Sequence, residues 1–390
     1  CVTGLTTVDT ATYWSPFGQA VIAAGIVVGG LGVMTLASIL GFAVSRHLGL
    51  TQRMLATQET GTGAMGQISL LLKAVIATSL TMQALLAAVF LPRFLSMGID
   101  PVRAVWDAVF MAISVFNNAG FVILPEGLSP HVTDWWMLIP IILGTTVGAI
   151  GFPVIMDVAK NLRTPRRWRL HTKLTLSTYL ILAFVGALAL ALTEWNNPAT
   201  LGAIDTPSKI LNAMLAGVNS RSSGLSALDV GAMQTQTHFV QDILMMIGGG
   251  SASTAGGVKV TTFAVLVLAV IAEARGDRDI ETFGRRIPTS AVRLAVAVSL
   301  LGLALVAVSV VLLLSMTSYS LDIILFETAS AFATVGLSTG ITPVLPVGAK
   351  YVLIFLMFAG RTGSMTVAAA LALRERSRVI RMPEERPIIG

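Results

Sequence analysis

The chain has 390 residues, of which 54% are hydrophobic and 12% are charged, and its formal net charge at pH 7 is +6. Soluble domains carry about 25% charged residues, so this composition excludes an ordinary soluble protein. Several apolar runs exceed the roughly 20 residues that a helix needs to cross a bilayer. The composition therefore predicts an all-α polytopic membrane protein surrounded by membrane lipid.

The positions of the basic residues predict how the chain is oriented. They cluster around Arg46 and Arg53, from Lys160 to Lys173, from Arg275 to Arg293, and from Arg374 to Arg386. The positive-inside rule places these four segments in the cytoplasm. The sequence has no basic groove interleaved with aromatic residues, so we expect no nucleic-acid partner.

Seven segments are predicted to span the membrane, and three shorter helices are not. The spans cover approximately residues 16–44, 68–95, 135–158, 172–192, 239–272, 291–316 and 349–373. The short helices lie near residues 101–116, 206–218 and 320–332, and helices of this length are typical of re-entrant segments. Asp100 and Asp205 each precede a helix-starting proline, which is a signal for a helix N-terminus.

A glycine preceded by small or polar residues and followed by a bulky apolar residue occurs four times. The copies are Val2-Thr3-Gly4-Leu5, Asn118-Ala119-Gly120-Phe121, Ser222-Ser223-Gly224-Leu225 and Thr334-Val335-Gly336-Leu337. One glycine after a short helix is usually only a C-cap, but four copies at matching places make coincidence a weak explanation. Four such turns around one axis can replace the water shell of a cation with carbonyl oxygens. The first three residues of each copy, which end in the glycine, are the candidate ion ligands.

The order of span, short helix, glycine turn and span defines repeated units. Complete units are expected at 68–160, 172–272 and 291–390, the last with a C-terminal tail. Residues 1–45 hold only a glycine turn and a closing span, so we expect the opening span and short helix of this unit to precede Cys1 in the natural protein. The predicted fold has four pseudo-repeated span–pore helix–span units around one central pore.

A glycine-rich run interrupts the fifth predicted span. Its candidate functional residues are Gly248, Gly249, Gly250, Ser251, Ser253, Thr254, Gly256 and Gly257. Each glycine disfavours a helix by roughly 1 kcal/mol relative to alanine. Small polar residues can satisfy unwound backbone where it lines a watery cavity. The run is either a packing surface or an intramembrane loop, and the composition favours the loop.

Three basic residues near membrane depth are functional candidates, because a charge there is costly: Arg221, Lys259 and Arg361. Arg221 either braces the third glycine turn, through carbonyls or an acid such as Glu327, or reaches outer water. The run that ends at Lys259 is not a phosphate-binding loop, because the lysine does not directly follow a glycine and no strand precedes it. We therefore expect no nucleotide cofactor on this chain.

These motifs resemble the Ktr/Trk/HKT superfamily of potassium transporters, and most of all the Ktr-type membrane subunit. The resemblance covers nearly the whole chain. It rests on VTGLTTVDT (2–10), FNNAGF (116–121), NSRSSGL (219–225), GGGSASTAGGVK (248–259), SAFATVGLS (330–338), FAGRTG (358–363) and the ending PIIG (387–390).

The resemblance implies a mechanism and partners. Each unit would supply one filter strand, and glycine in all four strands implies a preference for K⁺, with one glycine per strand implying looser selectivity than in potassium channels. Residues 248–257 would form the gating loop, contacted by Arg361. The family further implies a homodimer on a cytoplasmic ring of nucleotide-binding regulatory subunits in a bacterial inner membrane. Na⁺ is an activator in some relatives.

The leading hypothesis is potassium uptake through a single pore, with no covalent chemistry and hence no enzymatic activity. An alternating-access carrier for another cation or small solute is the alternative, because carriers also contain broken helices. An intramembrane hydrolase would need a serine with a base, or paired acids, at membrane depth. We find no such pair in the sequence.

Overall fold

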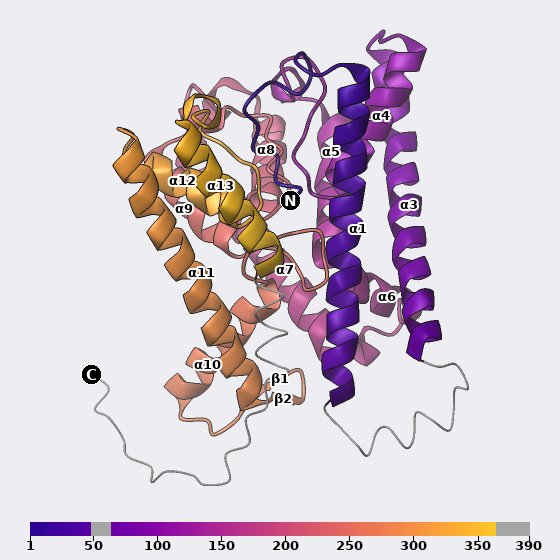
Figure 1. The fold of residues 1–390 in the computed structure, drawn as a ribbon, viewed down its shortest axis with the longest axis vertical. Helices are drawn as coiled ribbons and strands as arrows, with labels where there is room; N and C mark the ends of the chain where they lie inside the picture. The colour runs from indigo at the N-terminus through magenta and orange to yellow at the C-terminus, as the bar shows by residue number, and fades with distance from the viewer. Residues whose placement is uncertain (48–63, 364–390) are drawn as a thin grey trace.

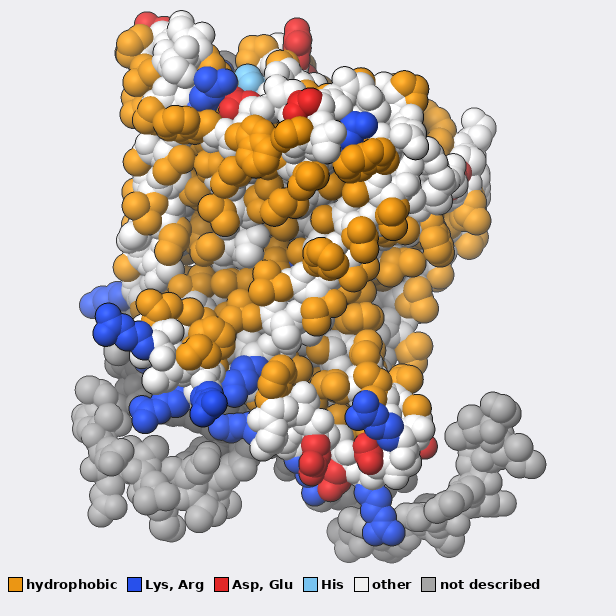
Figure 2. All heavy atoms as spheres, turned by 180° about the vertical axis from the view of Figure 1, so that it is seen from behind, with side chains coloured by type: hydrophobic (Ala, Val, Ile, Leu, Met, Phe, Trp, Pro, Cys, Tyr) orange, Lys and Arg blue, Asp and Glu red, His pale blue; other side chains and the backbone are white. Residues whose placement is uncertain are grey.

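The computed structural model describes residues 1–47 and 64–363, and this part of the chain is mostly helical. Four long helices match four of the predicted spans and run roughly along the long axis of the molecule (Figure 1). They are α1 (Pro16–His47), α3 (Ala64–Ser96), α7 (Leu170–Glu194) and α11 (Thr289–Met316). A broad hydrophobic band covers the middle of the surface, and basic side chains gather at one end (Figure 2).

By length and composition, three described helices can cross a membrane alone. These segments are Leu72–Ser96, Leu170–Glu194 and Thr289–Met316, and a bent helix pair gives a fourth. Of the other predicted spans, 16–44 lies within α1, whereas 135–158 and 239–272 are interrupted.

The three short helices lie where the sequence predicts them. They are α4 (Pro101–Phe116), α8 (Thr206–Asn219) and α12 (Leu321–Phe332). The Asp100 carboxylate accepts hydrogen bonds from two backbone N–H groups of the first turn of α4, and Asp205 accepts one in α8. Ser320, in contrast, makes no side-chain cap at the start of α12. The two start signals expected from the sequence, Asp100 and Asp205, therefore both cap their helices.

The predicted span 135–158 is wrong as a continuous helix. It consists of α5 (Trp135–Ile150) and α6 (Phe152–Lys160), which meet at an angle of 96°. Gly151 between them has φ +91°, a conformation that side chains other than glycine rarely adopt. Pro153 follows in the first turn of α6, where its missing N–H costs nothing.

The other two predicted spans also differ from a single continuous α-helix. Residues 239–272 form α9 (Thr235–Met246), a non-helical loop that contains the glycine-rich run, and α10 (Val260–Arg275). The last span begins as α13 (Val347–Phe358), which continues into a π-helical turn at Ala359–Gly363. The remainder of that prediction, from residue 364, lies outside the described residues.

The connections contain short elements that the sequence analysis did not anticipate. A hairpin of β1 (Ile280–Thr282) and β2 (Arg285–Ile287) departs from the all-α expectation. Its turn residues Phe283 and Gly284 both have positive φ, as tight hairpin turns require. Single 3₁₀ turns lie at Ser129–His131, Pro165–Arg167, Leu201–Ala203, Val230–Ala232 and Thr342–Val344.

Close packing through glycine positions the short helices against the long ones. A Cβ on Gly217 of α8 would lie 2.3 Å from the Ala183 carbonyl oxygen of α7. A Cβ on Gly186 of α7 would in turn lie 3.2 Å from the Gly217 Cα atom. Helices in membranes associate through such small residues, because lipid is as apolar as a leucine side chain.

We predict that Gly217→Ala destabilises the α7–α8 contact. The added methyl group has no room, and overpacking of this kind costs about 1–3 kcal/mol. The matched control is Gly25→Ala in α1, where a Cβ would meet nothing within 4 Å. Thermal unfolding of the purified protein should show a lower midpoint for Gly217→Ala only. Equal midpoints for the two variants would contradict this account.

Candidate functional site

Three of the four glycine turns are anchored to the end of the short helix that precedes them. The Ala119 N–H donates to the Ser114 carbonyl oxygen at 2.8 Å, and the Val335 N–H donates to that of Ser330 at 2.9 Å. In the third turn the Gly224 N–H donates to the Asn219 carbonyl oxygen at 3.4 Å. The turns are therefore direct continuations of α4, α12 and α8.

The side chains of the same three anchor residues also hold the turns, and the sequence analysis missed this role. The Ser114 hydroxyl donates to the Phe121 carbonyl oxygen and the Asn219 amide donates to that of Leu225, both at 2.6 Å. The Ser330 hydroxyl accepts the Gly336 N–H at 3.1 Å. The sequence does contain a signal for this role, because a polar residue stands five or six positions before the glycine in each of these three turns.

The backbone of the turns adopts conformations that favour glycine. φ is +78° at Gly4, +75° at Gly120, +60° at Gly224 and +99° at Gly336. Each turn has a second left-handed residue, which is two positions before the glycine in Val2, Asn118 and Thr334. In the third turn it is Ser223, one position before the glycine, so this turn differs from the other three.

The structure brings the four turns together in cyclic order. A Cβ atom on each glycine would lie very close to a carbonyl oxygen of the next turn. The distances are 2.6 Å from Gly4 to Ala119, 2.3 Å from Gly120 to Ser223, 2.4 Å from Gly224 to Val335 and 1.9 Å from Gly336 to Thr3. The fourth turn thus returns to the first, and no turn leaves space for a methyl group.

The segment after the fourth turn is held by a buried acid. The Glu327 carboxylate accepts hydrogen bonds from the Ser338 hydroxyl at 2.6 Å, the Thr339 N–H at 2.9 Å and the Thr342 hydroxyl at 2.8 Å. These donors lie just beyond Gly336 in the sequence. Glu327 is thus a positioning residue for this segment, and no ion pair joins it to Arg221 within the described chain.

Arg221 does not reach outer water, because its side chain is fully buried. Its guanidinium carbon lies 3.6 Å from the ring centroid of Tyr179 in α7, a cation–π geometry. None of its side-chain nitrogens has a hydrogen-bond partner among the described residues. Arg221 is therefore held by the ring of Tyr179, and not by the carbonyl oxygens or the acid that the sequence suggested.

The glycine-rich loop fills the break in the α5–α6 pair. The Gly250 N–H donates to the Ala149 carbonyl oxygen at 2.7 Å, and the Phe152 N–H donates to that of Ala252 at 3.3 Å. A Cβ on Gly151 would lie 2.6 Å from the Ser251 carbonyl oxygen. The unwound backbones of the two broken helices therefore satisfy each other, as non-helical backbone at membrane depth must.

Thr254 joins the loop to the second glycine turn. Its side chain shares a hydrogen bond with the Asn118 side chain, and its hydroxyl donates to the Gly148 carbonyl oxygen at 3.0 Å. The loop also touches the fourth turn, because a Cβ on Gly256 would lie 2.3 Å from the Thr334 hydroxyl oxygen. The loop therefore lies directly against two of the four turns.

Two buried cations hold the carbonyl oxygens of this loop. Lys259 donates to the Ala255 carbonyl oxygen at 2.6 Å, and Arg361 donates to the neighbouring carbonyl oxygen of Thr254. Arg361 lies in the π-helical turn after α13, next to Gly360, whose Cα packs closely on the Phe332 carbonyl of α12. Both cations thus contact the loop residues predicted from the sequence.

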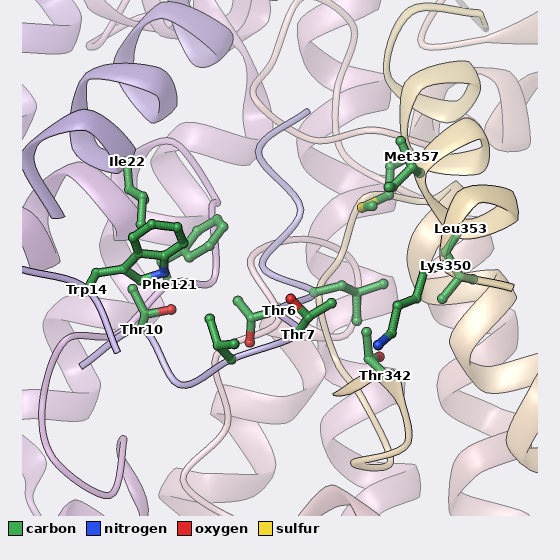
Figure 3. Close-up of a pocket in the computed structure, with 13 residues that line it drawn as sticks. Thr6, Thr7, Thr10, Trp14, Ile22, Phe121, Thr342, Lys350, Leu353 and Met357 are labelled. Atoms are coloured by element: carbon green, nitrogen blue, oxygen red, sulfur yellow. The ribbon is translucent and has the colours of Figure 1, made fainter. Parts of the chain in front are cut away.

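A cavity of about 310 Å³ lies beside the first glycine turn (Figure 3). Its walls come from the segment that follows Gly4, including Thr7 and Trp14, and from α13. Lys350, which donates to the Pro343 carbonyl oxygen at 2.7 Å, is its charged lining residue. Within the described ranges no group of three or more His, Cys, Asp or Glu side chains could hold a metal ion.

We predict that Gly120→Ala destabilises the protein more than Gly127→Ala. Both glycines have positive φ, so both variants lose about 1–2 kcal/mol through backbone strain. Only at Gly120 would the new methyl group also meet a neighbouring turn, whereas Gly127 faces open space. Thermal unfolding of the two variants checks this difference. A Gly120→Ala variant as stable as the Gly127→Ala control would show that the turns are not closely packed.

Comparison with known proteins supports the resemblance over the whole length. Residues 1–380 match the TrkH family, which is described as a cation transport protein. The Ktr system potassium uptake protein B of Bacillus subtilis is 37% identical over 389 residues, covering 100% of this chain and 87% of that protein. The protein of the same name from Vibrio alginolyticus is 32% identical, covering 100% and 85%.

A third relative and one solved structure extend the comparison. The potassium/sodium uptake protein NtpJ of Enterococcus hirae is 33% identical, covering 100% of this chain and 87% of that protein. The crystal structure of the potassium transporter TrkH from Vibrio parahaemolyticus matches the fold with a TM-score of 0.71 at 17% identity, covering 96% of this chain and 75% of that one. The chain therefore belongs to the TrkH family of cation transport proteins, which confirms the resemblance and the expected multi-pass protein of a bacterial cell membrane.

Proposed function

We propose that this protein takes up potassium ions across the bacterial inner membrane through a pore in which the four glycine turns select the ion. The observation that carries the proposal is the cyclic contact of the turns at Gly4, Gly120, Gly224 and Gly336. Relatives that are 37% and 32% identical are potassium uptake proteins by name, which supports K⁺ as the ion. Their names describe transport, which supports a protein without enzymatic activity.

The physical basis of selection is the replacement of the hydration shell by backbone carbonyls. The oxygens of Val2, Thr3, Asn118, Ala119, Ser222, Ser223, Thr334 and Val335, with those of the four glycines, are the proposed ligands. The C-terminal ends of α4, α8 and α12 point into the turns and add partial negative charge. The membrane potential supplies about 2.3 kcal/mol per charge per 100 mV for uptake.

The four-unit architecture belongs to the same proposal. The units are residues 1–45, 68–160, 172–272 and 291–390, each contributing one filter strand. The short helices that precede three of the turns, and the anchoring hydrogen bonds from Ser114, Asn219 and Ser330, support this repetition. A single pore would then lie on the axis of the ring.

The proposed gate is the loop 248–257. Thr254 contacts the second turn and Gly256 packs on the fourth, which supports a loop that would block an ion leaving the filter toward the cytoplasm. Lys259 and Arg361 latch it by donating to adjacent carbonyl oxygens. Opening requires these hydrogen bonds to break.

Partners follow from the relatives' names. Two relatives are part of a "Ktr system", which supports a separate regulatory component for this chain. We propose a homodimer on a cytoplasmic nucleotide-binding ring. The name potassium/sodium uptake protein of a third relative supports Na⁺ as a second ion, transported or activating.

The first functional prediction concerns the ion. Expression of the full-length protein in cells that lack potassium transport should restore growth at low K⁺. Gly120→Ser should lower the K⁺/Na⁺ uptake ratio by about tenfold or more, equivalent to roughly 1.4 kcal/mol of ion binding, because the serine side chain meets the neighbouring turn. Gly127→Ser is the control with the same positive φ and open space. An unchanged ratio in a well-expressed Gly120→Ser variant would contradict the filter.

The second functional prediction concerns the gate. Arg361→Gln and Thr254→Val should each increase K⁺ flux, because they remove hydrogen bonds that hold the loop in place. The Arg361 hydrogen bond involves a charged group and is worth about 1.5–3 kcal/mol, so its loss should raise flux through a mostly closed pore on the order of 10-fold or more. The Thr254 side chain bonds neutral groups, worth about 0.5–1.5 kcal/mol, so Thr254→Val should have a smaller effect. Thr254→Ser keeps the hydroxyl and should behave as the wild type. Unchanged flux in Arg361→Ala and in a deletion of residues 251–255 would remove the loop from the mechanism.

An alternating-access carrier is the second candidate, because two predicted spans are broken at membrane depth, as in many carriers. The two mechanisms differ in rate and in solute. Single-channel currents in a planar bilayer indicate a pore, whereas uptake of an organic solute with no resolvable current indicates a carrier.

A further inference from the structure

The connection between α6 and α7 carries an unusual excess of positive charge. We define the α6–α7 corner as residues 157–173. It contains six basic residues and one acidic residue, Asp157, which give a net charge of +5. The basic residues are Lys160, Arg163, Arg166, Arg167, Arg169 and Lys173.

The other well-described basic segment has a different character. Residues 273–293 contain five arginines and four acidic residues, a net charge of +1. Arg286 there forms an ion pair with Asp279 at 2.8 Å. Figure 2 shows the contrast at the end of the molecule: blue side chains lie without red on one side and are mixed with red on the other. The positive-inside rule counts basic residues in both segments and does not account for this difference in net charge.

The basic side chains of the corner are available to bind an external anion. The Asp157 carboxylate already accepts hydrogen bonds from the Thr172 hydroxyl at 2.6 Å and the Arg169 N–H at 2.9 Å. Lys160, Arg163, Arg166 and Arg167 are exposed, and none forms an ion pair within the described part of the chain. Four cations on one short surface without an acid repel one another, so an external anion stabilises them.

The geometry places this surface at the membrane boundary. α6 is bent by 96° from α5, and the basic side chains gather at the end of the molecule beyond the hydrophobic band (Figure 2). Leu162, between the basic residues, is 68% exposed. Trp168 is half-buried, and its indole N–H donates to the Asn161 carbonyl oxygen at 3.1 Å. Apolar side chains among exposed cations are typical of a segment that contacts both acyl chains and headgroups.

We infer that the α6–α7 corner binds the headgroup of an anionic phospholipid in the cytoplasmic leaflet. The guanidinium groups of Arg163, Arg166 and Arg167 match the geometry of a phosphate, which they can bind with two hydrogen bonds each. The exposed Leu162 side chain fits a lipid, because an apolar side chain beside the arginines can pack on acyl chain while they bind the headgroup. The inference does not depend on which ion passes through the protein.

The test is lipid binding by the full-length protein, measured by native mass spectrometry with phosphatidylglycerol and phosphatidylcholine. The corner variant is Arg163→Gln/Arg166→Gln/Arg167→Gln. The matched control is Arg275→Gln/Arg278→Gln/Arg285→Gln, which removes three arginines from the segment 273–293. We expect phosphatidylglycerol to bind more tightly than phosphatidylcholine. The corner variant should weaken phosphatidylglycerol binding about five-fold per arginine, on the order of 100-fold together, and the control by much less.

Two further measurements distinguish binding of a whole lipid from binding of a free phosphate group. Leu162→Ser should weaken phosphatidylglycerol binding, and glycerol phosphate without acyl chains should compete poorly. Equal binding of the two lipids, or equal losses in the corner variant and the control, would overturn the proposal. So would a corner variant that keeps phosphatidylglycerol binding but loses a soluble protein partner, since the surface would then dock a protein.

Discussion

The tight contact between four backbone turns is the constraint on which the rest of this structure depends. At each of Gly4, Gly120, Gly224 and Gly336 a methyl group would approach a carbonyl oxygen of the next turn to 2.6 Å or less. The turns can therefore meet only through backbone, with positive φ at every glycine. The proposed ion site rests on this close backbone contact, because it brings carbonyl oxygens of all four turns to neighbouring positions.

The surrounding helices hold these four turns in place. In its last turn, each of α4, α8 and α12 carries a polar residue whose side chain and carbonyl bind the glycine turn that follows. Each helix and its turn therefore behave as one element. Glu327 fixes the segment after the fourth turn, and the stack of Arg221 on Tyr179 braces the third. The third turn is the irregular one, because its second left-handed residue is Ser223 and lies one position later than in the others.

The glycine-rich loop explains why two predicted spans are broken at once. A helix interrupted alone at membrane depth would leave N–H and C=O groups without partners, at a cost of several kcal/mol each. Here the break at Gly151 and the loop at 248–257 exchange backbone hydrogen bonds with each other. The same contacts bring Thr254 to Asn118, so the turns and the loop are joined by a hydrogen bond and are not independent parts.

Sequence patterns predicted the short helices and the glycine turns well, because each depends on local chemistry. The bounds 101–116 agree with α4, where an aspartate and a proline begin the helix and a glycine turn follows its end. The bend at Gly151 was missed, because an apolar segment that contains three glycines and two prolines also fits a straight span. The partner of Arg221 and the role of Glu327 were not predictable, because both depend on which distant elements pack beside them. The family resemblance, in contrast, rested on the same turn motifs and is confirmed over residues 1–380.

The most direct measurement of the central claim is the position of a heavy potassium substitute in crystals of the full-length protein. Anomalous scattering from Rb⁺ or Tl⁺ should appear on the axis of the ring, between the carbonyl oxygens of the four turns. The signal should weaken in Gly120→Ser crystals. Ions bound only to acidic side chains away from the axis, or an empty ring at saturating Rb⁺, would contradict the account.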